Sequence, residues 1–167
     1  MEDPLTPHNG SVDDDPSDAI IDALLTASRL LVAISARSIA QVDETITIPQ
    51  FRTLVILSAR GAVNVANLAG LLDVQPSTTG RMVDRLVTAG LINRRPHPDS
   101  RRELVIELTA RGKEIVRSVT AYRRDEIARV VAKMPQRERR GLVRTLTAFT
   151  TAGGEPATHL EVDGYLV

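Results

Sequence analysis

The sequence predicts a mainly α-helical protein with a small β-wing. Apolar residues recur at helical spacing along most of the chain, whereas apolar and polar residues alternate only between about residues 91 and 108. Proline and glycine stand at the starts and ends of the helical stretches, and two short helical stretches are joined by a link of about three residues. Together these patterns predict a winged helix-turn-helix combined with a helical dimerisation region.

Composition limits the classes of protein that fit this chain. Its 167 residues, 43% of them hydrophobic, suffice for one domain with a core or for a small domain with an oligomerisation arm. It has no cysteine, which excludes disulfides and thiolate chemistry, and its three histidines are far apart, so no metal or other cofactor is expected. The lack of a run of about 18 apolar residues or a cationic signal start predicts a cytoplasmic protein without a membrane span.

Charge is distributed unevenly along the chain. The formal net charge is zero, but the first 22 residues carry seven acidic residues and no Lys or Arg. Between Pro76 and Arg102, six arginines stand against two aspartates, a net of +4. The acidic run Asp13–Asp15 lacks flanking ligands at metal-loop spacing, so we expect a solvated tail there. The neutral total therefore does not argue against a nucleic-acid partner.

Four helix starts can be read before the alternating region. Ser17 or Asp18 can cap a first helix that continues toward Val42, with an apolar stripe formed by Ile20, Leu24, Ala27, Leu31 and Ile34. Thr47 and Gln50 form a capping box that opens a helix to Arg60, where Gly61 stops it. Asn64 caps a short helix to Leu72, and Asp73–Gln75 link it to a helix that starts at Pro76 and stops at Gly90. The last two helices predict the helix-turn-helix.

The helix after Pro76 has two distinct sides. Its apolar residues Met82, Val83, Leu86 and Val87 are expected to face a core, which leaves Ser77, Thr78, Arg81 and Arg85 exposed. Arginine can donate two hydrogen bonds to guanine, and hydroxyl groups can bond phosphates or base edges, so this side suits the major groove of DNA. An ordinary solvated helix face is the alternative interpretation.

The alternating region predicts a hairpin beside that helix. Its strands are expected at Leu91–Arg95 and Glu103–Leu108, with Pro96–Arg102 as their connection. Leu104, Ile106 and Leu108 should share one side of the second strand, and Glu103, Val105 and Glu107 the other. Arg94, Arg95, Arg101 and Arg102 then cluster at the strand bases and tip, where arginine can enter a narrow minor groove.

Helices return after the hairpin. Thr109 can cap a helix over about 110–133, with Ile115, Val119, Tyr122, Ile127, Val130 and Met134 on its apolar side, and after Pro135 a last helix through Leu142 and Phe149 ends near Gly153. The first and last helices carry more apolar surface than a small winged core can cover, so a second copy is expected to cover it. Packing within one chain is the alternative.

These elements give an expected domain organisation. The expected parts are an acidic tail (1–17), an N-terminal dimerisation helix (18–46), a winged helix-turn-helix DNA-binding domain (47–109), C-terminal dimerisation helices (110–151) and a C-terminal tail (152–167).

Two segments resemble the multiple-antibiotic-resistance regulator (MarR) family of winged-helix transcription factors. They are TIPQFRTLVILS from Thr47, and VQPSTTGRMVDRLVTAGLINRRPHPDSRRELVIELTARGKEIV from Val74 to Val116. They are similar to the family's second helix, its recognition helix with an R-x-[VIL]-D-R-L core, its D-x-R wing and its L-T-x-x-G start of the fifth helix. The similarity in layout covers roughly residues 18–151 and is sharp over about 45 of them.

The resemblance implies a homodimer that binds a near-palindromic operator in double-stranded DNA, usually as a repressor, with an effector that lowers its affinity. Ser77, Thr78, Arg81 and Arg85 would contact the major groove, and Asp99 and Arg101 would form the wing pair, with Arg101 in the minor groove. Gly80 departs from the family, which often has a small hydroxyl residue there. The lack of cysteine and of clustered histidines leaves a small organic effector or none. Phe51 and Tyr122 are the aromatic candidates for its crevice, although helix-borne aromatics usually belong to a core.

Two other functions remain to be separated from this one. A winged-helix interaction module without DNA binding would leave Arg81, Arg85 and Arg101 dispensable. An enzyme is not expected, because the sequence offers no nucleophile–base pair, phosphate-binding glycine loop or paired carboxylates.

Overall fold

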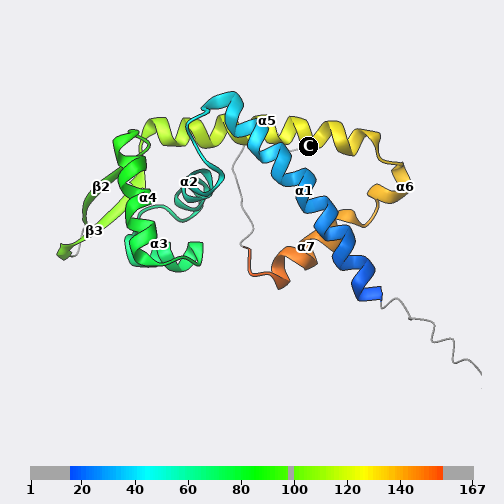
Figure 1. Ribbon diagram of the computed structural model, residues 1–167, viewed down its shortest axis with the longest axis horizontal. Coiled ribbons are helices and arrows are strands. Elements are labelled where there is room, and N and C mark those ends of the chain that lie inside the picture. Colours follow the sequence, from blue (N-terminus) through cyan, green and yellow to red (C-terminus); the bar gives the residue numbers. More distant parts are fainter. Residues whose placement is uncertain (1–15, 98–99, 156–167) are drawn as a thin grey trace, which may run out of the picture. The chain divides into compact units, whose positions relative to one another are not determined.

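The computed structural model describes residues 16–97 and 100–155 (Figure 1). Along the chain it has α1 (Pro16–Val42), α2 (Ile48–Arg60), β1 (Val63–Asn64), α3 (Val65–Leu72), α4 (Pro76–Thr88), β2 (Ile92–His97), β3 (Ser100–Leu108), α5 (Ala110–Lys133), α6 (Gln136–Arg139) and α7 (Leu142–Ala152). The chain divides into two compact units, Met1–Ala33 and Ile34–Val167. The mainly helical fold with a small sheet is confirmed.

Helix α1 begins at Pro16, two residues before the first helical position that a Ser17 cap would give. Pro16 already belongs to the helix, so Ser17 and Asp18 lie in its first turn and neither is its cap. Ser17–Val42 is long and apolar enough, by length and composition alone, to cross a membrane. The expectation of no span rested on an uninterrupted apolar run, whereas α1 reaches this composition with Asp22, Arg29 and Arg37 among its apolar residues. Buried core helices and N-terminal signal sequences of other proteins have the same length and composition, so this property establishes only that α1 is strongly apolar.

The predicted caps of α2 and α3 are confirmed. The Thr47 hydroxyl accepts from the backbone N–H of Gln50, and the Gln50 side chain accepts from the backbone N–H of Thr47 at 2.8 Å. Gly61 ends α2 with a φ of 75°, a backbone conformation that residues with a Cβ rarely adopt. The Asn64 side chain accepts from the N–H of Asn67 at 2.7 Å at the start of α3. These local contacts fix where both helices begin.

The wing is a three-stranded antiparallel sheet in the order β1-β3-β2, one strand more than predicted. Val63 pairs with Ile106, and Asn64 pairs with Val105. β2 and β3 also reach further into the predicted connection than the turn residues suggested, because Pro96 still pairs with Leu104 and His97 with Ser100. Asp99 lies outside the described residues.

The faces of β3 differ from the prediction at two positions. Ile106 and Leu108 are buried as expected, but Val105 is buried as well and Leu104 is 51% exposed. β1 pairs only with Val105 and Ile106, so Leu104 lies beyond the end of the third strand, opposite Pro96 alone. The twofold alternation therefore does not predict burial where the sheet narrows from three strands to two.

One hydrophobic core holds the winged part together. α2, α3, α4, the sheet, the first half of α5 and the residue just before β2 contribute its fully buried side chains, among them Leu54, Leu68, Val83, Leu86, Leu91, Ile92, Ile106, Val116 and Val119. Its buried hydroxyls are satisfied, since Thr53 donates to Pro49 O at 3.0 Å and Thr79 to Gln75 O at 3.3 Å. Phe51 belongs to this core, whereas Tyr122 on α5 is largely exposed.

The helices at the two ends of the described chain, in contrast to the core, leave many of their apolar side chains exposed. α7 has no buried residue, and Val143, Leu146 and Phe149 are exposed on it. In the N-terminal unit, α1 exposes the apolar residues Ile20, Ile21, Leu25, Leu30, Leu31 and Val32. Both segments therefore present apolar surface that the described residues do not cover.

Candidate nucleic-acid interface

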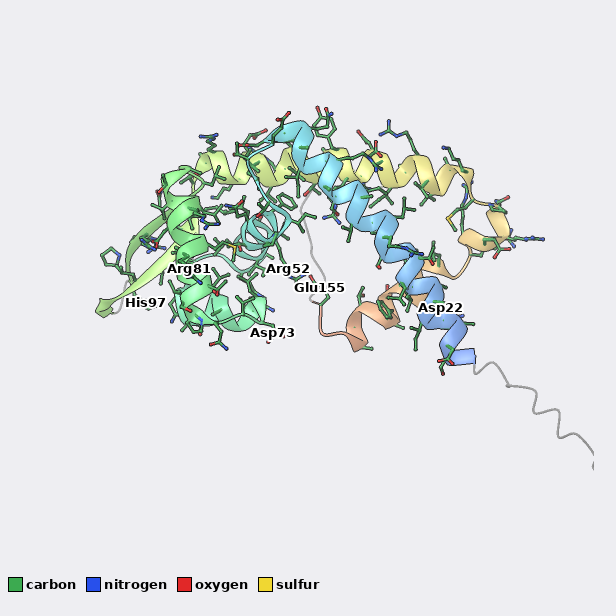
Figure 2. The ribbon with its side chains drawn as sticks, viewed as in Figure 1. Asp22, Arg52, Asp73, Arg81, His97 and Glu155 are labelled. Carbon is green, nitrogen blue, oxygen red and sulfur yellow. The ribbon has the colours of Figure 1, made fainter. Side chains whose placement is uncertain are left out.

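Helix α4 presents the polar side that its sequence predicts. Val83 and Leu86 are buried in the core and anchor the helix by its apolar face. Ser77, Thr78, Arg81 and Arg85 are exposed. Figure 2 shows Arg81 on this helix. Pro76 stands at the first helical position, where its lack of an N–H costs no hydrogen bond, so it favours a helix start there. The hydroxyl residues Ser77 and Thr78 follow it directly.

The two arginines of α4 are available for an external anion. Among the described residues, neither Arg81 nor Arg85 forms an ion pair. Gly80 lies between these hydroxyl and arginine side chains, and a Cβ built there would meet nothing within 4 Å. The exposed side of α4 is therefore short, cationic and sterically open.

Two other arginines of the predicted set are held inside the wing. Arg94 on β2 forms an ion pair with Asp84 on α4, and Arg95 Nε lies 2.9 Å from Glu107 Oε2 on β3. The first pair joins the base of the wing to α4, and the second joins the two long strands. These contacts depend on how α4 packs beside β2, which the sequence alone did not reveal.

The far end of the hairpin carries the remaining predicted residues. Asp99 and the side chains of Arg101 and Arg102 fall outside the described part of the structure. The backbone of Arg101 and Arg102 belongs to β3, and His97, labelled in Figure 2, ends β2. The described backbone thus places Arg101 and Arg102 on the strand that pairs with Arg94 and Arg95.

The C-terminal end of α4 contacts the start of α5 through several hydrogen bonds. The backbone N–H of Thr109 donates to Leu91 O at 3.1 Å, and its hydroxyl donates to Gly90 O at 2.8 Å. Arg111 Nη1 donates to Ala89 O at 3.2 Å. Arg111 Nη2 also lies 3.7 Å from Asp43 Oδ2, in the turn after α1.

The turn that contains Asp43 is itself well ordered by hydrogen bonds. Asp43 Oδ1 accepts from the Thr45 hydroxyl at 2.6 Å and from the Thr45 backbone N–H at 2.9 Å. These two bonds, with a smaller contribution from the charge of Arg111, hold the pKa of the Asp43 carboxyl below its usual value against the opposing effect of burial. Asp43 is therefore a charged anchor at the edge of the winged core.

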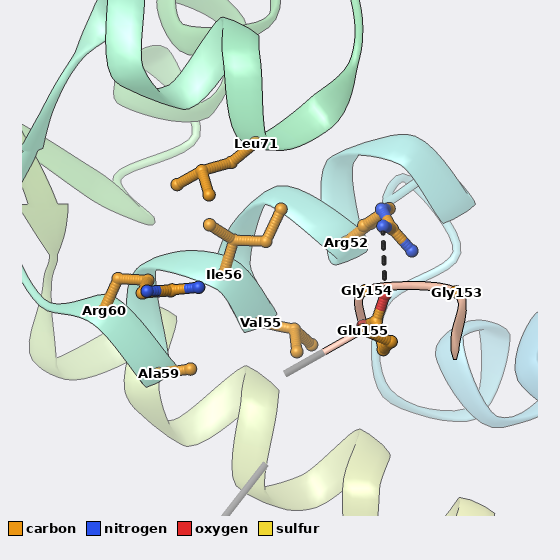
Figure 3. Close-up of a pocket in the computed structure, with 9 residues that line it drawn as sticks. All are labelled: Arg52, Val55, Ile56, Ala59, Arg60, Leu71, Gly153, Gly154 and Glu155. Atoms are coloured by element: carbon orange, nitrogen blue, oxygen red, sulfur yellow. Dashed lines mark hydrogen bonds and ion pairs between the residues drawn. The ribbon is translucent and has the colours of Figure 1, made fainter. Parts of the chain in front are cut away.

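A small pocket lies on the outer side of α2 (Figure 3). Its volume is about 220 Å³, below the roughly 300–1,000 Å³ usual for ligand sites. Arg52 and Arg60 on α2, Leu71 on α3 and Glu155 line it, and Arg52 Nη2 lies 3.4 Å from Glu155 Oε2. One wall belongs to the segment after α7, a helix with no buried residue, so packing does not hold that wall in place. Among the described residues, no group of three metal-ligating side chains is found.

The MarR family model matches residues 46–104, which include α2, β1, α3, α4, β2 and the first half of β3. The HTH-type transcriptional repressor Rv2887 of Mycobacterium tuberculosis is 32% identical over 101 residues, covering 60% of this chain and 73% of that protein. The chain belongs to the MarR family. This is a family of transcriptional regulators, and the resemblance seen in the sequence is thereby confirmed.

Other relatives of the MarR family define the extent of the similarity. The crystal structure of RV1404 from Mycobacterium tuberculosis has 71% sequence identity and a TM-score of 0.79, covering 86% of this chain and 97% of that chain. A mutant of MepR from S. aureus, solved bound to an oligodeoxyribonucleotide, is 19% identical with a TM-score of 0.59, covering 80% of this chain and 96% of that chain, and shows the same fold. The match to YhbI of Bacillus subtilis, an uncharacterized HTH-type regulator, is 35% identical over 42% of this chain and spans only 46% of that relative.

Proposed function

We propose that this protein is a dimeric, sequence-specific DNA-binding repressor of a near-palindromic operator. The observation that carries the proposal is the exposed side of α4, where Arg81 and Arg85 pair with no carboxylate among the described residues and stand beside Ser77 and Thr78. α4 would enter the major groove, where arginine can donate two hydrogen bonds to guanine. The repressor assignment is supported by the similarity to Rv2887, an HTH-type transcriptional repressor.

The wing would contact the adjacent minor groove. In this proposal Asp99, Arg101 and Arg102 act at the tip, with Arg101 in the groove. Arg94 and Arg95 lie nearer the body, and each already contacts a carboxylate, so either must share or exchange that partner when it meets a phosphate. Their proposed role is to hold the wing against α4 and to add positive potential near the DNA backbone.

The exposed apolar residues of α1 and α7 support the homodimer. Soluble proteins rarely leave large apolar helix faces exposed, and a two-fold partner would cover the same residues of each helix on both copies. Two copies would also place two α4 helices on successive major grooves, about one helical turn apart. The apolar character that lets α1 pass a membrane-span test is explained by this interface, and we propose that the protein acts in the cytoplasm.

If a small organic effector acts on this protein, we propose that it does so by shifting the population of dimers between two spacings of the α4 helices. Such a ligand would have to bind better when the two α4 helices are wrongly spaced for DNA. Neither Phe51, which is buried in the core, nor the small pocket beside Arg52 is proposed to bind it.

Selection of random DNA duplexes by the purified full chain tests the proposal. We expect enrichment of a palindrome with half-sites about one helical turn apart. Affinity for that duplex should fall by about three to five orders of magnitude between roughly 50 and 200 mM salt if the dimer contacts six to ten phosphates. A protein that enriches no duplex at low salt would instead support an interaction module without DNA binding.

Arg81→Ala provides the residue-level test of the same proposal. Its removal should cost about 1–3 kcal/mol of binding free energy and relax the base preference at one position of each half-site. Arg124→Ala is the matched control, because Arg124 is an exposed arginine on α5, away from α4. Equal losses for both variants, independent of DNA sequence, would contradict major-groove recognition by α4.

A further inference from the structure

The three consecutive backbone carbonyls that follow α4 accept hydrogen bonds from residues at the start of α5. Ala89 O accepts from Arg111 Nη1 at 3.2 Å, Gly90 O from the Thr109 hydroxyl at 2.8 Å, and Leu91 O from the Thr109 N–H at 3.1 Å. Carbonyls at a helix C-terminus carry partial negative charge, which favours the Arg111 guanidinium there. The Thr109 hydroxyl also accepts from Gly112 N at 3.0 Å, so one side chain both starts α5 and holds α4.

Gly112 allows this close approach. A Cβ built at Gly112 would overlap the carbonyl oxygen of Leu91 and lie 3.1 Å from the Leu91 carbonyl carbon. The obstacle is backbone, so it cannot move aside as a flexible side chain could. By comparison, a Cβ at Gly70 in α3 or at Gly80 in α4 meets nothing within 4 Å. Gly112 is therefore required by the contact between α5 and the segment that follows α4.

Arg111 extends this contact to a third segment. Its guanidinium lies between Ala89 O and the carboxylate of Asp43, which follows α1. Asp43 is held by two hydrogen bonds from Thr45, so its position is fixed by its own turn. The end of α4 is thus connected to α5 and to the turn after α1, and neither connection touches the exposed side of α4.

We propose that Thr109, Arg111 and Gly112, which we call the α4–α5 joint, are positioning residues that set the spacing between half-sites that the dimer accepts. The inference rests on the proposed function. α4 has 13 residues and is about 20 Å long, so a rotation of about 10° at the joint displaces its far end by about 3.4 Å, the rise of one base pair. The base contacts travel with α4 as a rigid helix, so the half-site sequence is unchanged.

The first experiment compares duplexes that keep the selected half-site sequence and differ in spacing by single base pairs. Wild type should prefer one spacing. In Arg111→Gln and Gly112→Ala, the affinity ratio between that spacing and its neighbours should fall by about 5-fold or more, the lower end of ordinary coupling between sites, while the preferred half-site bases stay the same. Arg117→Gln and Gly70→Ala are the matched controls: Arg117 pairs with Glu114 on α5 alone, and Gly70 has open space. Both controls should keep the wild-type profile.

Arg111→Gln keeps the test decisive if Gly112→Ala does not fold, because Arg111 is exposed and no core residue is lost. A folded Arg111→Gln variant with the wild-type spacing profile would overturn the proposal. An equal loss at every spacing would also overturn it, because that result would indicate a lost phosphate contact or a general loss of stability.

The second experiment needs no DNA. The chain has no cysteine, so Gln75→Cys places one spin label per subunit at the exposed start of α4. The distance between the two labels in the dimer should have a broader or shifted distribution in Arg111→Gln than in Arg117→Gln. Identical distance distributions would overturn the proposed role of the α4–α5 joint even if DNA binding is normal. A wild type that binds no duplex, or forms no dimer, would contradict the proposed function and remove the basis of this inference with it.

Discussion

The winged core and the terminal helices of this chain are both rich in apolar residues, but only the core buries them within one chain. Leu54 on α2 is 0% exposed and packs with residues from α3, α4, the sheet and α5. Val143 on α7 is 79% exposed, and α1 carries a series of apolar residues that are 45–59% exposed. The two kinds of surface therefore have different partners: the core is stabilised within one chain, whereas the terminal helices are expected to require a second copy.

Truncation in the two regions should give the largest difference. Leu54→Ala removes a fully buried side chain and should lower the free energy of unfolding by about 2–5 kcal/mol. Leu146→Ala removes the same atoms from a residue that is 46% exposed on α7, and should cost far less when measured at low protein concentration. Urea denaturation followed by circular dichroism measures both. Equal losses at high dilution would show that α7 packs within its own chain.

The sequence predicted the core more completely than the terminal surfaces because the core obeys local rules. The cap formed by Thr47 and Gln50, the Asn64 cap and the stop at Gly90 each involve residues close in sequence, and the structure has all of them. β1 was missed because two residues give no periodicity and its pairing with Val105 and Ile106 spans about 40 residues of chain.

In the candidate site, too, local sequence patterns predict some features, whereas others depend on how distant elements pack. The exposure of Arg81 and Arg85 follows from helical periodicity, so it could be predicted. The ion pair of Arg94 with Asp84 and the bond of Arg111 to Ala89 O depend on the angles between α4, β2 and α5, which no local pattern encodes. The L-T-x-x-G pattern around Thr109 and Gly112 was the one signal of that joint in the sequence.

A charged residue on the apolar stripe of α1 tests the other side of the comparison. Leu31→Glu would place a carboxylate among residues that we propose to be buried between two copies, and should weaken the dimer by about 2 kcal/mol, roughly 30-fold in dissociation constant. Sedimentation analysis over a range of concentrations measures it. Thr26→Glu is the control, because Thr26 lies on the polar side of the same helix, where its hydroxyl accepts from Arg29. If both variants dimerise like wild type, α1 is not the interface.

The helix caps should make a smaller contribution within the core. Thr47→Ala removes the hydroxyl that accepts from Gln50 N, and should lower the free energy of unfolding by about 1 kcal/mol. Thr88→Ala is the comparison, because the Thr88 hydroxyl only donates to Asp84 O inside α4. Chemical denaturation of the two variants should rank Thr47→Ala as the more damaging. The reverse ranking would mean that the capping box does not determine where α2 begins.

The smallest expected effect is a pH dependence at the turn between α1 and the core. Because the Thr45 hydroxyl and N–H lower the pKa of Asp43 in the folded protein, the unfolded chain binds more protons near the ordinary aspartate pKa of 3.8. This contribution is therefore complete above that pH and is lost as the pH falls through the lower folded value. The stability gap between wild type and Asp43→Asn should shrink as the pH is lowered from about 6 to about 2.5, in melting curves compared at each pH. Thr45→Val removes the strongest of these hydrogen bonds and should reduce the same pH dependence, whereas a gap that stays constant would mean that Asp43 gains nothing from its turn.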